Sequence, residues 1–289
     1  MPSALIVEFL VSRHYECFGL IIEFLIKANN INHIDIYVPK FDNDIFLKDW
    51  VSFFKINYLN IITIRLIHNL PPDKKGYQTL FYVTSEEYHD FKETTRNIVA
   101  NDIYGIAHHE DIRGHKDVVN VSNFNTVTLS KVFQYNPIAI DFKLRIDKEL
   151  WIRNNFSPVE ITHFFNGIQY FITGNTQLLD LNITNTLLAK NNKRCLVISR
   201  NAIPKMSNIV GFRMAPTKIL IYCLLKLSGI FIPKKGCMYY KGQLSGIIHL
   251  AASFESRLLI PNTIYDMHKL SRYPNIEPFS QDADLLSKL

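Results

Sequence analysis

Residues 240–254 read YKGQLSGIIHLAASF, between an apolar run, GIFIP at 229–233, and a second one, LLIP at 258–261. The order is therefore a strand, a loop of small residues, a helix with an alanine and serine face, and a strand that ends in proline. At the helix start, Ser245 and Gly246 would present free main-chain N–H groups and the positive end of the helix dipole. A diphosphate is a typical occupant of such a helix start. An ordinary strand–helix–strand unit whose glycines serve only packing is the alternative interpretation.

Strands and helices alternate along the whole chain, which predicts α/β domains with parallel sheets. In the first half, the expected strands lie at 4–9, 34–39, 60–66, 79–84 and 97–107, and expected helices lie at 14–28 and around 46–54. In the second half, the expected strands lie at 170–175, 194–199 and 208–212, with helices at 178–188 and 219–227. The segment 145–159 is polar and contains Pro158, which predicts a linker. We therefore expect two open α/β domains, 1–145 and 146–289.

The composition narrows the class of protein. With 289 residues, 47% of them apolar and 20% charged, the chain can bury one large core or two ordinary ones. The net charge of +6 suits anionic ligands, but the lysines and arginines are scattered, so we expect no nucleic-acid partner. The four cysteines form no Cys-x-x-Cys pair, which predicts a reducing compartment and hence a cytoplasmic location. We expect neither a signal peptide nor a membrane span; the basic charge would fit peripheral membrane attachment, but no lysine-rich amphipathic helix stands out.

Several cofactor motifs are missing from the chain. The first expected strand runs into Ser12 with no G-x-G-x-x-G, and no Walker A pattern occurs, so we expect neither NAD, FAD nor P-loop chemistry. Residues 42–44 read Asp-Asn-Asp, which has the spacing of a metal-binding Asp-x-Asp motif. They follow Pro39 at an expected helix start, however, where aspartates serve as caps. We therefore expect no metal and no resident cofactor.

Two histidines are candidate general bases. His109 lies in the run His-His-Glu-Asp at 108–111, just past an expected strand, where open α/β folds place their ligands. A histidine there could take a proton from a hydroxyl nucleophile, because its ordinary pKa lies near neutrality. His14 follows the first expected strand in the same way. The alternatives are a solvated polar loop for His109 and a capping or packing role for His14. Adjacent side chains diverge, so metal binding by 108–111 is not expected.

Polar and cationic side chains follow the expected strands of the second half. If those strands are parallel, the side chains share one rim and would neutralise a diphosphate leaving group. Phe212 and Met214 could flank a flat nucleobase, although apolar residues near a strand end are more often part of the core. The rim candidates are Asn175, Arg200, Arg213, Lys218, Lys234 and Lys235, each of which could also be an ordinary surface residue.

The second half resembles the donor domain of GT-B glycosyltransferases, most clearly over 168–289. The run YFITG at 170–174 is similar to the strand and glycine turn that open that domain, and NIVGF at 208–212 to a later strand and glycine ahead of the base pocket. Residues 242–261 are similar to the loop, helix and strand that hold the donor phosphates. In the first half, VVNVS at 118–122 resembles the strand ending in serine near the end of the acceptor domain.

The resemblance implies two Rossmann-like domains facing across a cleft, with 1–145 on the acceptor side and 146–289 holding a nucleotide sugar. It implies metal-independent transfer of a sugar from a nucleotide diphosphate donor to a hydroxyl of a glycan or glycoconjugate, with His109 or His14 as the base. The implied donor-binding residues are Gly174, Asn175, Arg200, Phe212, Arg213, Met214, Gln243, Leu244, Ser245 and Gly246.

The chain also departs from the family. Many retaining members carry two glutamates across the donor loop and helix, where this chain has Gly242 and Leu250. The departure leaves the donor sugar and the stereochemical outcome open, and it keeps a catalytically silent binding or scaffold protein as the alternative. An NAD-dependent epimerase would need a glycine fingerprint that is absent. Richness in asparagine, lysine and isoleucine suggests an AT-biased genome such as that of a large DNA virus.

Overall fold

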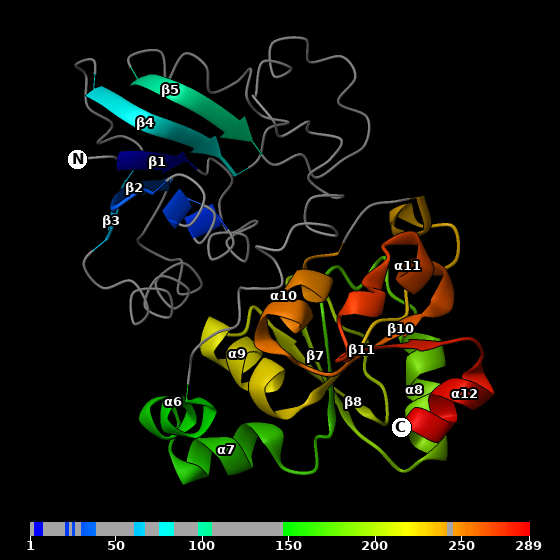
Figure 1. The fold of residues 1–289 in the computed structure, drawn as a ribbon. Coiled ribbons are helices and arrows are strands. Elements are labelled where there is room, and N and C mark those ends of the chain that lie inside the picture. Colours follow the sequence, from blue (N-terminus) through cyan, green and yellow to red (C-terminus); the bar gives the residue numbers. More distant parts are fainter. Residues whose placement is uncertain are drawn as a thin grey trace. The chain divides into compact units, whose positions relative to one another are not determined.

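The computed structural model divides the chain into two compact units, Met1–Phe142 and Lys143–Leu289. It describes residues 3–7, 21–22, 25–26, 30–38, 61–66, 75–83, 98–105, 147–241 and 245–289. Each unit contains one parallel sheet accompanied by helical residues, so the expected α/β class is confirmed (Figure 1). No helix within these ranges is long and apolar enough to cross a membrane.

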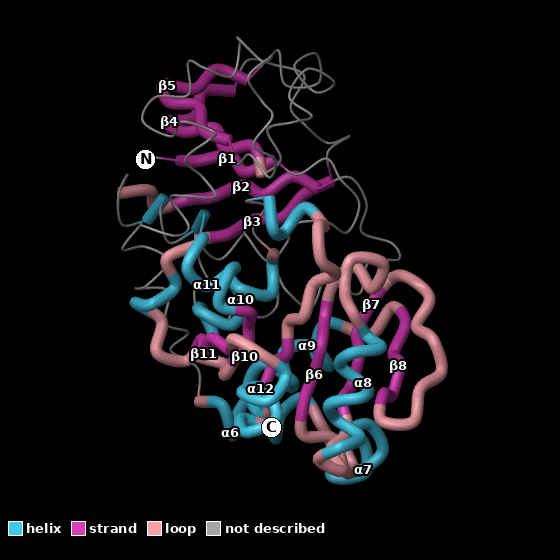
Figure 2. The backbone as a smooth tube through the Cα atoms, turned by 90° about the vertical axis from the view of Figure 1, so that its right-hand side faces the viewer, coloured by secondary structure: helices cyan, strands magenta, loops and turns pink. Residues whose placement is uncertain are grey.

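The first unit is built on a five-stranded sheet with the strand order β3-β2-β1-β4-β5, which Figure 2 shows from one side. Its strands are β1 (Ser3–Val7), β2 (His33–Val38), β3 (Ile62–Leu66), β4 (Lys75–Tyr82) and β5 (Ile98–Gly105). All neighbours pair in parallel, and the chain moves outward from β1 to β3 before it returns to the other side of β1. This reversal makes a topological switch point between β1 and β4. The expected strand at 118–122 lies outside the described residues.

A buried carboxylate joins three strands of this sheet. Asp35 on β2 is fully buried and accepts a hydrogen bond of 2.7 Å from the hydroxyl of Tyr77 on β4. His33 Nε2 and Arg65 Nε lie 3.2 and 3.6 Å from its Oδ1 atom. Burial, together with Asp35, raises the pKa of Tyr77 well above its usual value, so Tyr77 remains a hydrogen-bond donor. An aspartate can be buried at this position because its carboxylate oxygens have hydrogen-bond partners and a neighbouring cation balances its charge.

The second unit is built on a six-stranded sheet with the strand order β11-β10-β9-β6-β7-β8. Its strands are β6 (Tyr170–Thr173), β7 (Cys195–Ser199), β8 (Ile209–Arg213), β9 (Ser228–Ile230), β10 (Leu258–Pro261) and β11 (Ile276–Phe279). All pairs are parallel. Counted from β6, the order is that of a complete Rossmann sheet, 3-2-1-4-5-6, with its switch point between β6 and β9.

Helices cover both faces of this sheet (Figure 1). They are α6 (Lys148–Asn155), α7 (Pro158–Phe165), α8 (Leu181–Lys190), α9 (Thr217–Lys226), α10 (Gly246–Phe254), α11 (Asn262–Met267) and α12 (Asp282–Lys288). Helix α9 packs against α10 and α6, whereas α8 packs against α12. This division follows from right-handed crossovers, which send the helix between β6 and β7 to one face and the helices that follow β8 and β9 to the other.

The prediction of a linker at 145–159 is wrong, because this segment forms α6 and the start of α7. Asp147 caps α6 by accepting a hydrogen bond of 3.0 Å from Leu150 N. Ser157 and Glu160 form a reciprocal capping box at the start of α7, and Pro158 occupies the first helical position. Proline is favoured there because its missing N–H would have no partner in the first turn. The polar residues and the proline therefore mark helix starts.

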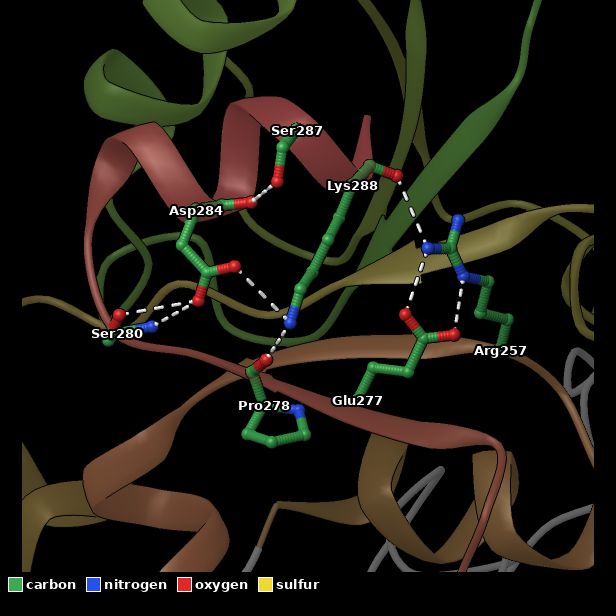
Figure 3. A network of polar contacts seen from close by, with 7 residues as sticks. All are labelled: Arg257, Glu277, Pro278, Ser280, Asp284, Ser287 and Lys288. Atoms are coloured by element: carbon green, nitrogen blue, oxygen red, sulfur yellow. Dashed lines mark hydrogen bonds and ion pairs between the residues drawn. The ribbon is translucent and has the colours of Figure 1, made fainter.

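A polar network fixes the last helix to the amino-terminal edge of the second sheet (Figure 3). Arg257, which precedes β10, donates two hydrogen bonds of 2.8 and 2.9 Å to Glu277 on β11 and a third, of 3.2 Å, to the main-chain oxygen of Lys288. Lys288 in turn contacts Asp284 at 3.4 Å and donates to the main-chain oxygen of Pro278. These contacts hold α12 against β11 and the start of β10.

Candidate functional site

Two glycine-containing loops lie at the switch point of the second sheet. Gly174 follows β6 with φ of 125°, and Gly236 lies in the loop after β9 with φ of 76°. Apart from the glycine itself and its two chain neighbours, no atom of the described residues lies within 4 Å of the point where a side chain on either glycine would begin. Both glycines are therefore required by their backbone angles, and both leave room for another molecule to approach the main chain.

The two loops are joined by main-chain hydrogen bonds. Lys234 N donates to Leu178 O and Asp180 N donates to Ile232 O, in hydrogen bonds of 2.8 Å each. Because β6 and β9 are paired neighbours in the sheet, these bonds continue their contact beyond the strand ends. The loops at the switch point form one connected surface.

The loop after β9 ends in a tight turn that carries two lysines. Cys237 N donates to Lys234 O over 3.2 Å, and the positive φ of Gly236 fits the third position of a type II turn. Lys234 and Lys235 are exposed, and neither is paired with a carboxylate in the part of the chain that the structure describes. By contrast, Lys218 and Lys226 are each paired with a glutamate. Uncompensated lysines beside open glycines favour an anionic ligand.

Side-chain hydrogen bonds join the tips of β6 and β7. The buried Ser199 hydroxyl donates to Gly174 O over 2.8 Å and accepts from Asn201 N over 3.1 Å. The Asn201 amide donates to Asn175 Oδ1, which also accepts from Gln177 N over 3.0 Å. Side-chain hydrogen bonds thus connect the loop after β6 to the end of β7, and main-chain hydrogen bonds connect it to the loop after β9.

The tip of β8 completes the rim. Arg213 Nε donates to Arg200 O over 3.1 Å, and Met214 N donates to Ser199 O over 2.9 Å. Met214 has φ of 56° and is 56% exposed as a residue. This backbone conformation is unusual for a non-glycine residue, and the position is an exposed apolar one. Non-glycine residues in sparsely populated backbone conformations cluster at ligand sites. Hydrogen bonds thus connect the loops that carry Gly174, Asn175, Arg200, Arg213 and Met214; that these residues bind a donor stays a prediction.

The residues expected around a base have packing contacts of their own. The ring of Phe212 lies 5.6 Å from that of Phe164 on α7. Ile203 packs over Gly211 so closely that a side chain on Gly211 would begin 2.9 Å from its Cγ2 atom. Gly211 thus makes room for Ile203 at an exposed position of the edge strand β8, and the base-binding role of Phe212 stays a prediction.

Helix α10 begins where the sequence predicts, with Ser245 as its N-cap and Gly246 as its first residue. Within the described residues, no side-chain capping hydrogen bond is formed at this helix start. Ser245 is buried and shares a side-chain hydrogen bond with Tyr239, whose ring lies 5.2 Å from that of Phe231 just after β9. The helix start is therefore tied to the carboxyl end of β9. Gln243 and Leu244 lie outside the described residues.

The helix that follows β6 begins differently. Asp180 caps α8 by accepting a hydrogen bond of 3.0 Å from Ile183 N. In dinucleotide-binding Rossmann domains this helix start holds the pyrophosphate. Here its own carboxylate occupies the position, which agrees with the missing glycine fingerprint. Of the two helix starts compared, only that of α10 lacks a side-chain cap.

Three other expectations have different outcomes. Lys218 does not belong to the open rim, because its Nζ atom lies 2.9 Å from Glu160 Oε1 and donates to Asn155 O. His14 and His109 lie outside the described residues, so the candidate bases stay predictions. Within the described ranges, no group of three histidine, cysteine, aspartate or glutamate residues could hold a metal ion.

Sequence reasoning missed Ser199, Asn201 and Gly236. Ser199 and Asn201 belong to the run Ser-Arg-Asn, which begins at the last residue of a fully buried strand, a signal that could have identified them. Gly236 follows the two lysines and could have been recognised as a turn glycine. The sequence does not show that Ser199 reaches the neighbouring loop, because this contact depends on strand order.

Comparison with known proteins supports the fold. No protein-family model matches the chain, and no curated protein matches it in sequence. A UDP-GlcNAc 2-epimerase from Neisseria meningitidis, solved with UDP-GlcNAc, aligns with a TM-score of 0.51 and 8% identity over 99% of this chain and 90% of its own. The E. coli heptosyltransferase WaaC, solved with ADP-2-deoxy-2-fluoro heptose, aligns with a TM-score of 0.42 and 12% identity over 89% of this chain and 87% of its own. Anabaena Alr3699/HepE, solved with UDP and glucose, aligns with a TM-score of 0.46 and 8% identity over 100% of this chain and 89% of its own. The chain therefore has the fold of two Rossmann-like α/β domains that the epimerase also has.

Proposed function

We propose that this protein is a glycosyltransferase that uses a nucleotide diphosphate sugar and transfers the sugar to a hydroxyl of a glycan or glycoconjugate. The second domain would bind the donor at the carboxyl edge of β6, β7, β8 and β9. The transfer would need no metal, since lysine and arginine side chains would neutralise the diphosphate as it leaves. The support comes from the site, from the fold and from the sequence resemblance together.

One observation carries the proposal: Gly174 and Gly236 lie at the Rossmann switch point. Within the described residues, both have open space in front of them, and the two lysines beside Gly236 have no carboxylate partner. Glycine lets the main chain approach a phosphate closely, and lysine supplies the charge. The uncapped start of α10 lies in the loop region after β9 and would add main-chain donors.

Calorimetric titration with UDP, GDP, TDP, ADP and CMP tests donor binding. At least one of these nucleotides should bind, and the corresponding nucleoside should bind measurably but more weakly, because the phosphates contribute part of the affinity. A protein that binds none of them would contradict the proposal. Donor hydrolysis in the absence of an acceptor then tests activity, since a transferase hydrolyses its donor slowly and a silent binding protein leaves it intact.

The candidate bases are tested by substitution. His109→Ala should abolish transfer and leave nucleotide affinity nearly unchanged, because the proposed role of His109 is to deprotonate the acceptor hydroxyl. If His109→Ala keeps full activity, the same pair of measurements on His14→Ala decides whether His14 has that role. Loss of nucleotide affinity in parallel with activity would instead indicate a structural role.

A second candidate function is epimerisation of a nucleotide sugar. It is favoured by the alignment with the UDP-GlcNAc 2-epimerase, which extends over 99% of this chain. The products distinguish the two: an epimerase converts the nucleotide sugar into its isomer without releasing the nucleotide diphosphate, and a transferase releases that diphosphate. Chromatography of the reaction mixture with each nucleotide sugar that binds separates these outcomes.

A further inference from the structure

We infer that Ser199 is a positioning residue that turns the main-chain N–H of Asn175 toward the donor diphosphate. This inference rests on the proposed function, because it assigns the phosphate-binding atom within the same site. Ser199 itself would not touch the ligand. It would act through the peptide bond between Gly174 and Asn175.

The hydroxyl of Ser199 is fixed by two hydrogen bonds. Ser199 is the last residue of β7 and is 5% exposed. Its Oγ donates a hydrogen bond of 2.8 Å to Gly174 O. The same Oγ accepts from Asn201 N over 3.1 Å, so its single proton is committed to Gly174. A buried hydroxyl with both roles assigned holds one orientation.

This bond determines where the following N–H points. A trans peptide is planar, so the oxygen of Gly174 and the N–H of Asn175 point in opposite directions; the described chain contains no cis peptide. With the oxygen held toward β7, the N–H of Asn175 points away from it. Among the described residues, no acceptor receives a hydrogen bond from this N–H.

The surroundings make this N–H available to a ligand. The backbone at Gly174 has φ of 125° and free space where a side chain would begin. The Asn175 side chain cannot cover its own N–H, because its Oδ1 atom is already bonded to Asn201 and Gln177. A fixed donor beside open space gains a charge-assisted hydrogen bond from a phosphate without having to reorganise.

The test uses inorganic pyrophosphate as the probe and the Asn175 amide signal in a ¹⁵N–¹H NMR spectrum as the readout. In the unmodified protein, pyrophosphate should shift this amide proton downfield. In Ser199→Ala, pyrophosphate should no longer shift this amide proton. The affinity of this variant for pyrophosphate, and for the nucleoside diphosphate that binds, should fall about tenfold. Ser199→Thr keeps the hydroxyl and should restore both. Ser207→Ala, the same change at an exposed serine whose hydroxyl bonds only Asn208 among the described residues, should have no effect.

Affinity for the corresponding nucleoside separates positioning from general damage. It should be equal in all variants, because Ser199 acts on a phosphate-binding atom alone. Equal loss of nucleoside and diphosphate affinity in Ser199→Ala would overturn the inference, and so would an unmoved Asn175 amide in an unmodified protein that binds pyrophosphate. The latter measurement decides even if Ser199→Ala does not fold. An unmodified protein that binds neither pyrophosphate nor any nucleoside diphosphate would overturn the proposed function itself.

Discussion

Lys218 Nζ lies 2.9 Å from Glu160 Oε1 and thereby joins helix α9 to the capping box of α7. The same lysine donates to Asn155 O at the end of α6 and lies 4.8 Å above the ring of Phe156. One side chain thus holds three helices on one face of the second sheet. The two helices that precede β6 are fixed to the Rossmann core by this contact.

Substitution of Glu160 by glutamine should lower the melting temperature and flatten its dependence on acid pH. The hydrogen bond from Ser157 N, with Lys218, lowers the pKa of Glu160 to about 2. A carboxyl whose pKa is lowered by folding stabilises the protein above its ordinary pKa, and this contribution is lost as pH falls toward the lowered value. The difference in melting temperature between the two proteins should therefore shrink between about pH 4.5 and pH 2. A constant difference over this range would contradict the assignment.

Glu277→Gln should destabilise the second domain by about 1 kcal/mol, because it removes a two-point contact with Arg257 on a partly buried pair. The pKa of Glu277 is lowered by that contact, so the loss should be full at neutral pH and should decrease below the ordinary carboxyl pKa. Urea unfolding at pH 7 and pH 3.5 measures both. Glu149→Gln is the matched control, since Glu149 pairs with Lys226 at a more exposed site and should change stability little.

Gly174→Ala should cost about 1–3 kcal/mol of folding stability and weaken diphosphate binding, because alanine is strained at φ of 125°. The cost would come from the backbone alone, since a side chain at Gly174 meets no atom within 4 Å. Gly76→Ala is the control: it is equally open, lacks the positive φ, and should be nearly neutral. Equal stability of both variants in urea unfolding would contradict the strain at Gly174.

The double substitution Lys234→Gln and Lys235→Gln should weaken binding of the nucleoside diphosphate several-fold and leave the affinity for the nucleoside unchanged. The residual binding should also depend less on salt, because fewer charges are screened. Lys190→Gln is the control, since Lys190 ends helix α8 at the opposite edge of the sheet. Calorimetry at two salt concentrations checks all three proteins, and a parallel loss in Lys190→Gln would indicate a nonspecific effect of charge.

The buried cysteines should not react in the folded protein. Burial raises the pKa of the Cys195 and Cys223 thiols above its ordinary value, so neither forms the reactive thiolate at neutral pH. Cys237 lies in the partly exposed turn after β9 and should be alkylated first among these three. Peptide mapping after brief iodoacetamide treatment, with and without urea, checks this order. Modification of Cys195 without urea would show that the β7 region opens.

Much of the fold could be predicted from the sequence because the periodicity is local. Apolar runs such as 194–199 and 258–261 have the length and flanking residues of buried parallel strands, and they match β7 and β10 closely. The start of α10 at Ser245 could be located for the same reason. The linker at 145–159 was misassigned because the same polar residues that mark loops also cap helices, and Pro158 suits a first helical turn.

By itself, the sequence determined the parallel α/β class, the strand-end positions of Gly174, Arg200 and Arg213, and the start of helix α10 at Ser245. Tertiary structure decided what these residues do to one another. Strand order places β7 beside β6, so that Ser199 reaches Gly174, and places β9 on the other side, so that Lys234 meets Leu178. Such contacts join residues 25 or more positions apart, and only the pairing of distant strands brings them within hydrogen-bond distance.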